Sequence, residues 1–300
     1  MKKQYFFSFV LAILSVIAAK SIVKFGAKSY YHEKAISFQK EDGYFDLEHA
    51  NSIQQLPMGN APLTHLSMID SVNYVCIQSQ TGNVVLYNID SNRVSSPLNF
   101  GQLKPFRDVI VVDSSLFLFD DDMSVYRSYA PYDSMSTVKL VEGNTDFKSG
   151  GICLHAITHR LFIIKDVPLN DTENSKRSVY TYNLNKTQFI EEPLFTFDVE
   201  DLDAFAEKNN IKIGFFKKDE FGDTIHGLSF IPSDIAVHPK TNEIYILSSV
   251  DKTIAVFNQF GELVNMSILT DRAFSNPSGM TFNALGDLFI SNNDLINNSI

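Results

Sequence analysis

Short apolar stretches separated by polar turns recur along most of this 300-residue chain. The clearest copy begins at Ser233 and reads SDIAVH, PKTN, EIYILSS, VDK, TIAVFN, QFG and ELVNMSIL. Apolar stretches of this length, bounded by turns that contain Pro, Asn and Gly, are typical of β-strands joined by tight reversals. The pattern therefore predicts four consecutive antiparallel strands.

This unit is repeated. Its copies begin at Thr64, Arg107, Gly150, Ser233 and Ser278, at intervals of 43, 43, 83 and 45 residues. A period in the forties with four strands in each copy is typical of the blades of a β-propeller. We predict an all-β chain in which residues 30–300 form one propeller domain of five four-stranded blades. The last copy has two clear strands, so we expect its outer strand to come from the N-terminal side, at KAISFQ or YFDLEH.

The 83-residue interval leaves the blade count open. It has room for two blades, which would give six, or for one blade and an insertion. The segment DVEDLDAFAEKNN has acidic residues at its start, and Leu202, Phe205 and Ala206 are spaced to share one helix face. This pattern favours five blades with an inserted short helix.

The first residues resemble an export signal. Lys2 and Lys3 precede an apolar run at residues 5–19, which Lys20 closes. We predict that residues 1–29 are either a cleaved signal peptide or an N-terminal hydrophobic helix that stays in the membrane. In both cases the rest of the chain would be exported to the periplasm, the cell envelope or the extracellular side of the membrane. Residues 5–19 would contact the membrane if they are not cleaved.

Charge and cysteine usage narrow the range of partners. A net charge of -10 disfavours nucleic acid as a partner, because binding to phosphates needs clustered Lys and Arg. Cys76 and Cys153 lie inside apolar runs, where a thiol usually packs as a small hydrophobic group. A disulfide between them is not implied.

A family resemblance enters at IPSDIAVHPKTNEIYILSSVDKTIAVFNQFGELV, followed by NPSGMTF and GDLFISNN. These stretches resemble the SdiA-regulated family of exported β-propellers, which includes YjiK-like proteins. The resemblance extends from about Tyr44 to Asn293, and it implies the fold and export rather than an activity. Family members tend to begin inner strands with Glu-Gly or Ser-Gly, and most of those glutamates are replaced here. If the family's acids hold a cation, this chain has lost several of its oxygen ligands.

Candidate binding residues follow from the repeat. In a propeller, the inner strand of each blade starts, and the second strand ends, on the same face beside the central channel. Each of these positions could instead be an ordinary solvated turn residue. The predicted ligand-binding residues at this channel mouth are Thr64, His65, Arg107, Asp108, Asp120, Ser233, Asp234, Ser278 and Asn292. The metal candidates are Asp108, Asp120, Asp121 and Asn292, with Ca²⁺ as the ion that carboxylate oxygens would suit.

No catalytic residues are predicted, because the chain contains no G-x-S-x-G, phosphate-loop or H-E-x-x-H motif. We therefore expect a non-catalytic binding or scaffold protein of the cell envelope, whose partner is an envelope protein or a small ligand. The alternative is a calcium-dependent hydrolase of lactonase-like or phytase-like type, which would use the channel mouth. Arg107, Gly150 and Ser278 interrupt the acidic ring that such an enzyme would need.

Overall fold

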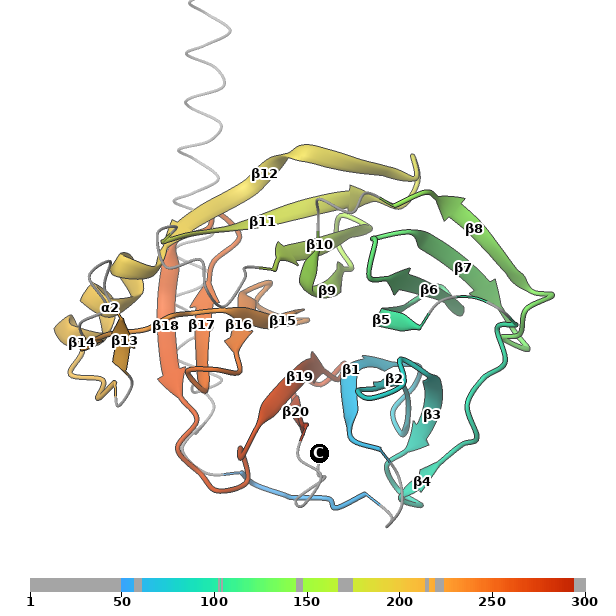
Figure 1. Ribbon diagram of the computed structural model, residues 1–300, viewed down its shortest axis with the longest axis horizontal. Helices are drawn as coiled ribbons and strands as arrows, with labels where there is room; N and C mark the ends of the chain where they lie inside the picture. Colours follow the sequence, from blue (N-terminus) through green and yellow to red (C-terminus); the bar gives the residue numbers. More distant parts are fainter. Residues whose placement is uncertain are drawn as a thin grey trace, which may run out of the picture. The chain divides into compact units, whose positions relative to one another are not determined.

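The described part of the chain is built from antiparallel sheets in which each strand pairs with its neighbour in the sequence. A computed structural model describes residues 50–56, 61–101, 103, 105–143, 148–166, 175–213, 216–218 and 224–293. Figure 1 shows five of the sheets arranged around a central axis, with their first strands β1, β5, β9, β15 and β19 innermost. This arrangement defines a β-propeller, as the repeat predicted.

Four repeats form complete four-stranded blades. The first has β1 (Leu63–Met68), β2 (Asn73–Gln78), β3 (Val84–Asn88) and β4 (Arg93–Val94). The second has β5 (Phe106–Val112), β6 (Ser115–Asp120), β7 (Val125–Tyr129) and β8 (Thr137–Val141). The third has β9 (Ser149–His155), β10 (Arg160–Lys165), β11 (Lys176–Asn183) and β12 (Gln188–Asp198). The fourth has β15 (Pro232–Val237), β16 (Ile244–Ser248), β17 (Thr253–Phe257) and β18 (Leu263–Ile268).

The fifth repeat differs from the others. It forms a two-stranded sheet of β19 (Pro277–Phe282) and β20 (Leu288–Asn292), and β19 lies between β15 and β1 to complete the ring of inner strands (Figure 1). The prediction of five four-stranded blades is therefore wrong in its count, since the described residues form four. The segments KAISFQ and YFDLEH, expected to supply the outer strand, lie outside the described residues.

The long interval between the third and fourth repeats holds one blade and an insertion. Helix α2 (Val199–Lys208) follows β12 directly, and a hairpin of β13 (Phe216–Lys218) and β14 (Thr224–His226) comes after it. Asp198 caps the helix by accepting a hydrogen bond from the backbone N–H of Glu200 at 3.1 Å. Leu202 and Ala206 are buried on its inner face. The predicted inserted helix is confirmed.

Apolar side chains from adjacent blades meet between the sheets and form the core. Phe162 and Ile164 of the third blade pack in one cluster with Ile235 and Ile246 of the fourth. Burying each such side chain contributes roughly 1.5–3 kcal/mol, so these contacts hold neighbouring blades together. Cys76 and Cys153 are both free and buried, in agreement with the sequence.

The predicted signal peptide or anchor, residues 1–29, lies outside the described residues. Within the part of the chain that the structure describes, none of the helices combines the length and apolar character needed to cross a membrane.

Candidate functional site

Every inner strand carries an irregularity near its start. Its pairing with the second strand skips one residue, which is a β-bulge, and bulges often redirect a side chain next to a functional site. The skipped residues are His65, Arg107, Gly150, Ser233 and Ser278. They lie in corresponding regions of the five repeats, close to where the repeats were predicted to begin.

Alignment of the pairing registers identifies one equivalent position in each repeat. Leu66, Val109, Ile152, Ile235 and Met280 pair with corresponding apolar residues of the second strands. The residues immediately before them form what we call the channel ring: His65, Asp108, Gly151, Asp234 and Gly279. Three ring positions thus carry ionisable side chains and two carry glycine.

The three ionisable residues of the channel ring converge, although they come from three different blades. One potential ligand atom from each of His65, Asp108 and Asp234 lies within 4.8 Å of the other two. The Nδ1 atom of His65 is 3.4 Å from Oδ2 of Asp108 and 3.8 Å from Oδ1 of Asp234. Asp108 and Asp234 are only 1% and 3% exposed, so both carboxyl groups are almost fully removed from water.

Backbone groups satisfy these carboxyl groups only in part. Oδ1 of Asp108 accepts a hydrogen bond from the N–H of Val109 at 2.8 Å, and Asp234 accepts from Ile235 and from Met280. Oδ2 of Asp108 and Nδ1 of His65 face each other as an ion pair, and among the described residues neither atom has a hydrogen-bond partner. Because buried polar atoms gain from hydrogen bonds, these two atoms mark a place where a ligand could bind.

The two glycines of the channel ring make this convergence possible. A Cβ atom on Gly151 would lie 2.5 Å from Cα of Asp234, and one on Gly279 would lie 2.7 Å from the backbone N of His65. Gly151 also has φ +149°, a conformation that side chains rarely allow. The inner strands can therefore approach closely only because these positions lack side chains.

Burial and charge act on the protonation of this cluster together. Burial lowers the pKa of His65, but the carboxylates of Asp108 and Asp234 outweigh it and raise the pKa from 6.5 to about 8. Burial, assisted by Asp234, raises the pKa of Asp108 above its usual value, while His65 opposes that shift. At neutral pH the cluster therefore favours an imidazolium beside the carboxyl groups.

A polar cavity of about 700 Å³ opens at the end of the channel where the inner strands start. All five repeats line it, and His65 is the one ionisable residue of the channel ring among its lining residues. Arg107 contacts the neighbouring third repeat: its Nη2 atom is 3.8 Å from Oδ2 of Asp166, and its Nε donates to the carbonyl of Ser149 at 3.3 Å. The cavity wall therefore presents charges of both signs.

The structure divides the predicted site residues into three groups. The lining of the polar cavity includes Thr64, His65, Arg107, Asp121, Ser233 and Ser278. Asp108 and Asp234 are buried beside His65 and are absent from that lining. Asp120 and Asn292 are buried in strand ends, where they accept backbone hydrogen bonds.

The bonds of Asp120 explain its position. Its Oδ1 accepts from the N–H groups of Asp122 and Ser124, and its Oδ2 accepts from the Tyr126 hydroxyl at 3.2 Å. Asn292 similarly accepts from the N–H of Asn276 at 3.4 Å. The predicted metal set of Asp108, Asp120, Asp121 and Asn292 did not include His65 and Asp234. His65 and Asp234 occupy the same position of the repeat as Asp108. This shared position in the sequence could have placed the three residues together.

Comparison with known proteins does not assign the chain to a family. The chain matches neither a protein-family model nor a curated protein. Similar solved structures include a gluconolactonase from Xanthomonas campestris, with a TM-score of 0.48 and 12% identity over 80% of this chain and 73% of that chain. A luciferin-regenerating enzyme gives 0.47 and 9% over 80% and 72%. A chain of a nidogen/laminin complex gives 0.47 and 9% over 77% and 72%. The resemblance to the SdiA-regulated family receives no support from these comparisons.

Proposed function

We propose that this propeller is a binding protein that holds a small polar ligand, or a polar group of a partner protein, in the cavity at the start of the inner strands. The observation that carries this proposal is one cavity of about 700 Å³ lined by all five repeats. Its volume lies within the range of about 300–1,000 Å³ that is usual for ligand pockets. Arg107 and Asp166, which lie side by side in the cavity wall, would orient a ligand that offers both an acceptor and a donor.

A blocking variant tests this proposal. Ser233 lies in the cavity wall, so Ser233→Tyr should fill part of the cavity, whereas Val138→Tyr would place the same group on the exposed outer strand β8. Thermal unfolding of the full chain would be followed with sugars, short dicarboxylates and diamines as probes. We expect one class to raise the melting temperature of the wild type and of Val138→Tyr but not of Ser233→Tyr. A shift retained in Ser233→Tyr would exclude this cavity.

Export remains part of the proposal, on the evidence of Lys2, Lys3 and the apolar run at residues 5–19. We propose that the propeller works outside the cytoplasm, in the cell envelope or beyond it. A reporter fused to the C-terminus should be active only in its exported form. Activity confined to the cytoplasm would contradict this placement.

A second candidate function is a metal-dependent hydrolase, because His65, Asp108 and Asp234 place three potential ligand atoms together. Nδ1 of His65 and Oδ2 of Asp108 form an ion pair with each other, and both would fit a cation that replaced the proton of His65. One nitrogen and two carboxylate oxygens suit a transition metal such as Zn²⁺ or Mn²⁺ better than Ca²⁺, which prefers six to eight oxygen ligands. A bound metal would polarise a substrate oxygen, and the buried carboxyl groups would hold it at the base of the polar mouth.

Metal analysis and turnover separate the two candidates. Metal content and melting temperature would be measured with Zn²⁺, Mn²⁺ and Ca²⁺ for the wild type, for Asp108→Asn and for Asp90→Asn as an exposed control outside the cavity. Hydrolysis of lactone and phosphoester substrates that depends on the metal and disappears in Asp108→Asn alone would favour the hydrolase. Binding of polar probes without turnover would favour the binding protein.

A further inference from the structure

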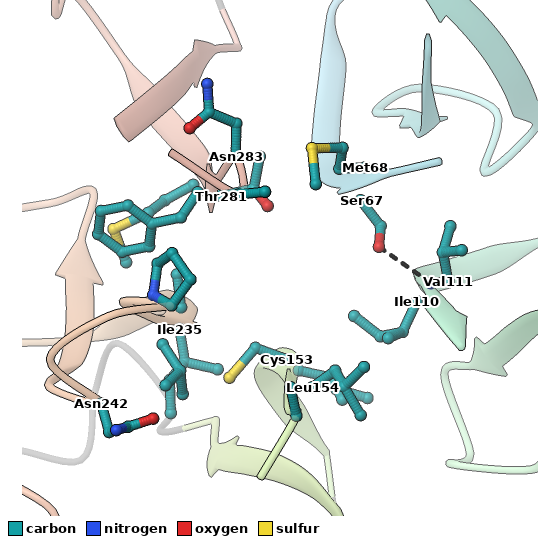
Figure 2. Close-up of a pocket in the computed structure, with 18 of the residues that line it drawn as sticks. Ser67, Met68, Ile110, Val111, Cys153, Leu154, Ile235, Asn242, Thr281 and Asn283 are labelled. Atoms are coloured by element: carbon teal, nitrogen blue, oxygen red, sulfur yellow. Dashed lines mark hydrogen bonds between the residues drawn. The ribbon is translucent and has the colours of Figure 1, made fainter. Parts of the chain in front are cut away.

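A second cavity, of about 300 Å³, lies where the inner strands end. Residues of all five inner strands line it, together with hairpin turns that follow β9, β15 and β19. Its central layer consists of the residues two positions after the channel ring: Ser67, Ile110, Cys153, Ala236 and Thr281. Figure 2 shows Ser67, Ile110, Cys153 and Thr281 around one open space.

The chemistry of this lining differs from that of the polar mouth. Most of the lining side chains are aliphatic or otherwise apolar, and none of the described residues that form it is charged. Its polar groups are two hydroxyls and two amides. The Oγ atom of Ser67 accepts a hydrogen bond from the N–H of Val111 at 2.9 Å, which leaves its own hydroxyl hydrogen able to bind a ligand (Figure 2).

We propose that this cavity is a second binding site, which takes a small uncharged molecule with an apolar body and one hydrogen-bonding group. The volume sets the size, at the low end of the range for ligand pockets, about 300 Å³. The apolar wall favours an apolar body because it removes that surface from water. An ionic group would lose hydration without meeting an opposite charge in the wall, so a neutral molecule is preferred.

One exposed residue indicates that a ligand can enter this cavity from solvent. Ile157, in the turn between β9 and β10, lines this cavity and is 72% exposed. It therefore forms part of an apolar rim that is open to water, while Cys153 and Ala236 are buried further inside. Because Ile157 is largely solvated, its replacement should alter the rim without disturbing the fold.

Octanol is a suitable probe, because it has an apolar chain and one neutral hydroxyl group. Calorimetric titration of the full chain would compare it with octanoate and octylammonium, which carry opposite charges on similar chains. We expect octanol to bind about tenfold more tightly than either ion. Equal or tighter binding of octylammonium would show that the acidic surface, rather than the apolar cavity, determines binding. Absence of octanol binding would overturn the proposal.

Two variants locate the probe. Ala236→Leu should fill the central layer and weaken octanol binding about tenfold, with circular dichroism as the check on folding. Ile157→Lys should add a cation at the rim and improve octanoate binding relative to octanol by about threefold. Val138→Lys, an exposed apolar position on β8, is the matched control and should leave that ratio unchanged. If Ala236→Leu does not fold, the ratio measured in Ile157→Lys decides. An unchanged ratio would overturn the proposal.

Discussion

The two ends of the channel differ sharply, although the same five strands build both. Strand β5 contains both chemistries: the carboxyl group of Asp108 lies beside His65, and Ile110, two residues later, lines the apolar cavity. Successive side chains of a strand alternate between faces, so positions two apart can share the channel side. The comparison shows that one regular backbone can support a charged site and an apolar site in adjacent layers.

The largest effect should come from placing a charge in the wrong layer. Ile110 is 5% exposed among apolar residues, so Ile110→Asp would bury a carboxylate without a partner. We expect a loss of about 4 kcal/mol in the free energy of unfolding, against about 1 kcal/mol for Ile110→Val. Urea unfolding followed by circular dichroism would measure both. Equal losses would mean that the apolar layer tolerates charge as the channel ring does.

The close approach of strands in the charged layer gives the next effect. Gly151→Ala would place a Cβ atom 2.5 Å from Cα of Asp234. Gly101→Ala is the control, because Gly101 has φ +74° in an exposed turn. A Cβ atom there would lie 3.2 Å from its nearest neighbour, the Cβ of Ser134. We expect losses of about 3 kcal/mol and about 1 kcal/mol respectively, because both variants strain the backbone but only the first meets another strand. Similar unfolding midpoints would contradict the close-packed ring.

The pH dependence of stability tests the electrostatics of the charged layer. The pKa of His65 is raised to about 8 in the folded state, so its contribution is complete below pH 6.5 and is lost as pH rises through about 8. That shift corresponds to about 2 kcal/mol. His65→Asn alone would raise the pKa of Asp108 further, because His65 lowers it, so the test variant is His65→Asn combined with Asp108→Asn. Asn also tolerates the positive φ of His65, and the double variant should remove the decline.

The matched control for this pH experiment is His159→Asn, since His159 is more exposed and pairs with Asp113 at the surface. Unfolding would be measured from pH 6 to 9 with a chelator present, so that metal binding does not contribute. A decline that persists in the His65→Asn/Asp108→Asn double variant would assign the effect to another group.

The smallest expected effect is the difference in stability between alanine variants of the adjacent residues Asp120 and Asp121. Asp120 accepts three hydrogen bonds, so Asp120→Ala should cost about 1–2 kcal/mol in the free energy of unfolding. Asp121 is exposed, and Asp121→Ala should stay within about 0.5 kcal/mol. The same urea titrations would show this difference. Equal values would mean that Asp120 does not hold its turn together.

The sequence predicted the scaffold well because the repeat is a property of local pattern. Thr64, Arg107, Gly150, Ser233 and Ser278 all lie in inner strands of the propeller. The inserted helix was also predictable, since Leu202 and Ala206 share one face. The blade count was not, because the last copy forms only two strands among the described residues, and strand spacing does not show whether another segment pairs with them.

The candidate site was predictable residue by residue but not as a group. His65, Asp108 and Asp234 were each expected at the channel, yet their convergence depends on glycines in the other two repeats, Gly151 and Gly279. Asp120 looked equivalent to a mouth residue, and its role in a buried turn depends on the Tyr126 hydroxyl. Such contacts arise from three-dimensional packing, which strand spacing does not report.

The seam between β19 and β1 links the site to the order of folding. These strands lie at opposite ends of the described chain, so bringing them together closes the longest loop in the fold, and contacts of this kind form slowly. His65 and Gly279 meet across this seam. Local opening of this seam would separate His65 from its neighbours while the other blades stay folded. The channel ring is therefore complete only when β19 has joined β1.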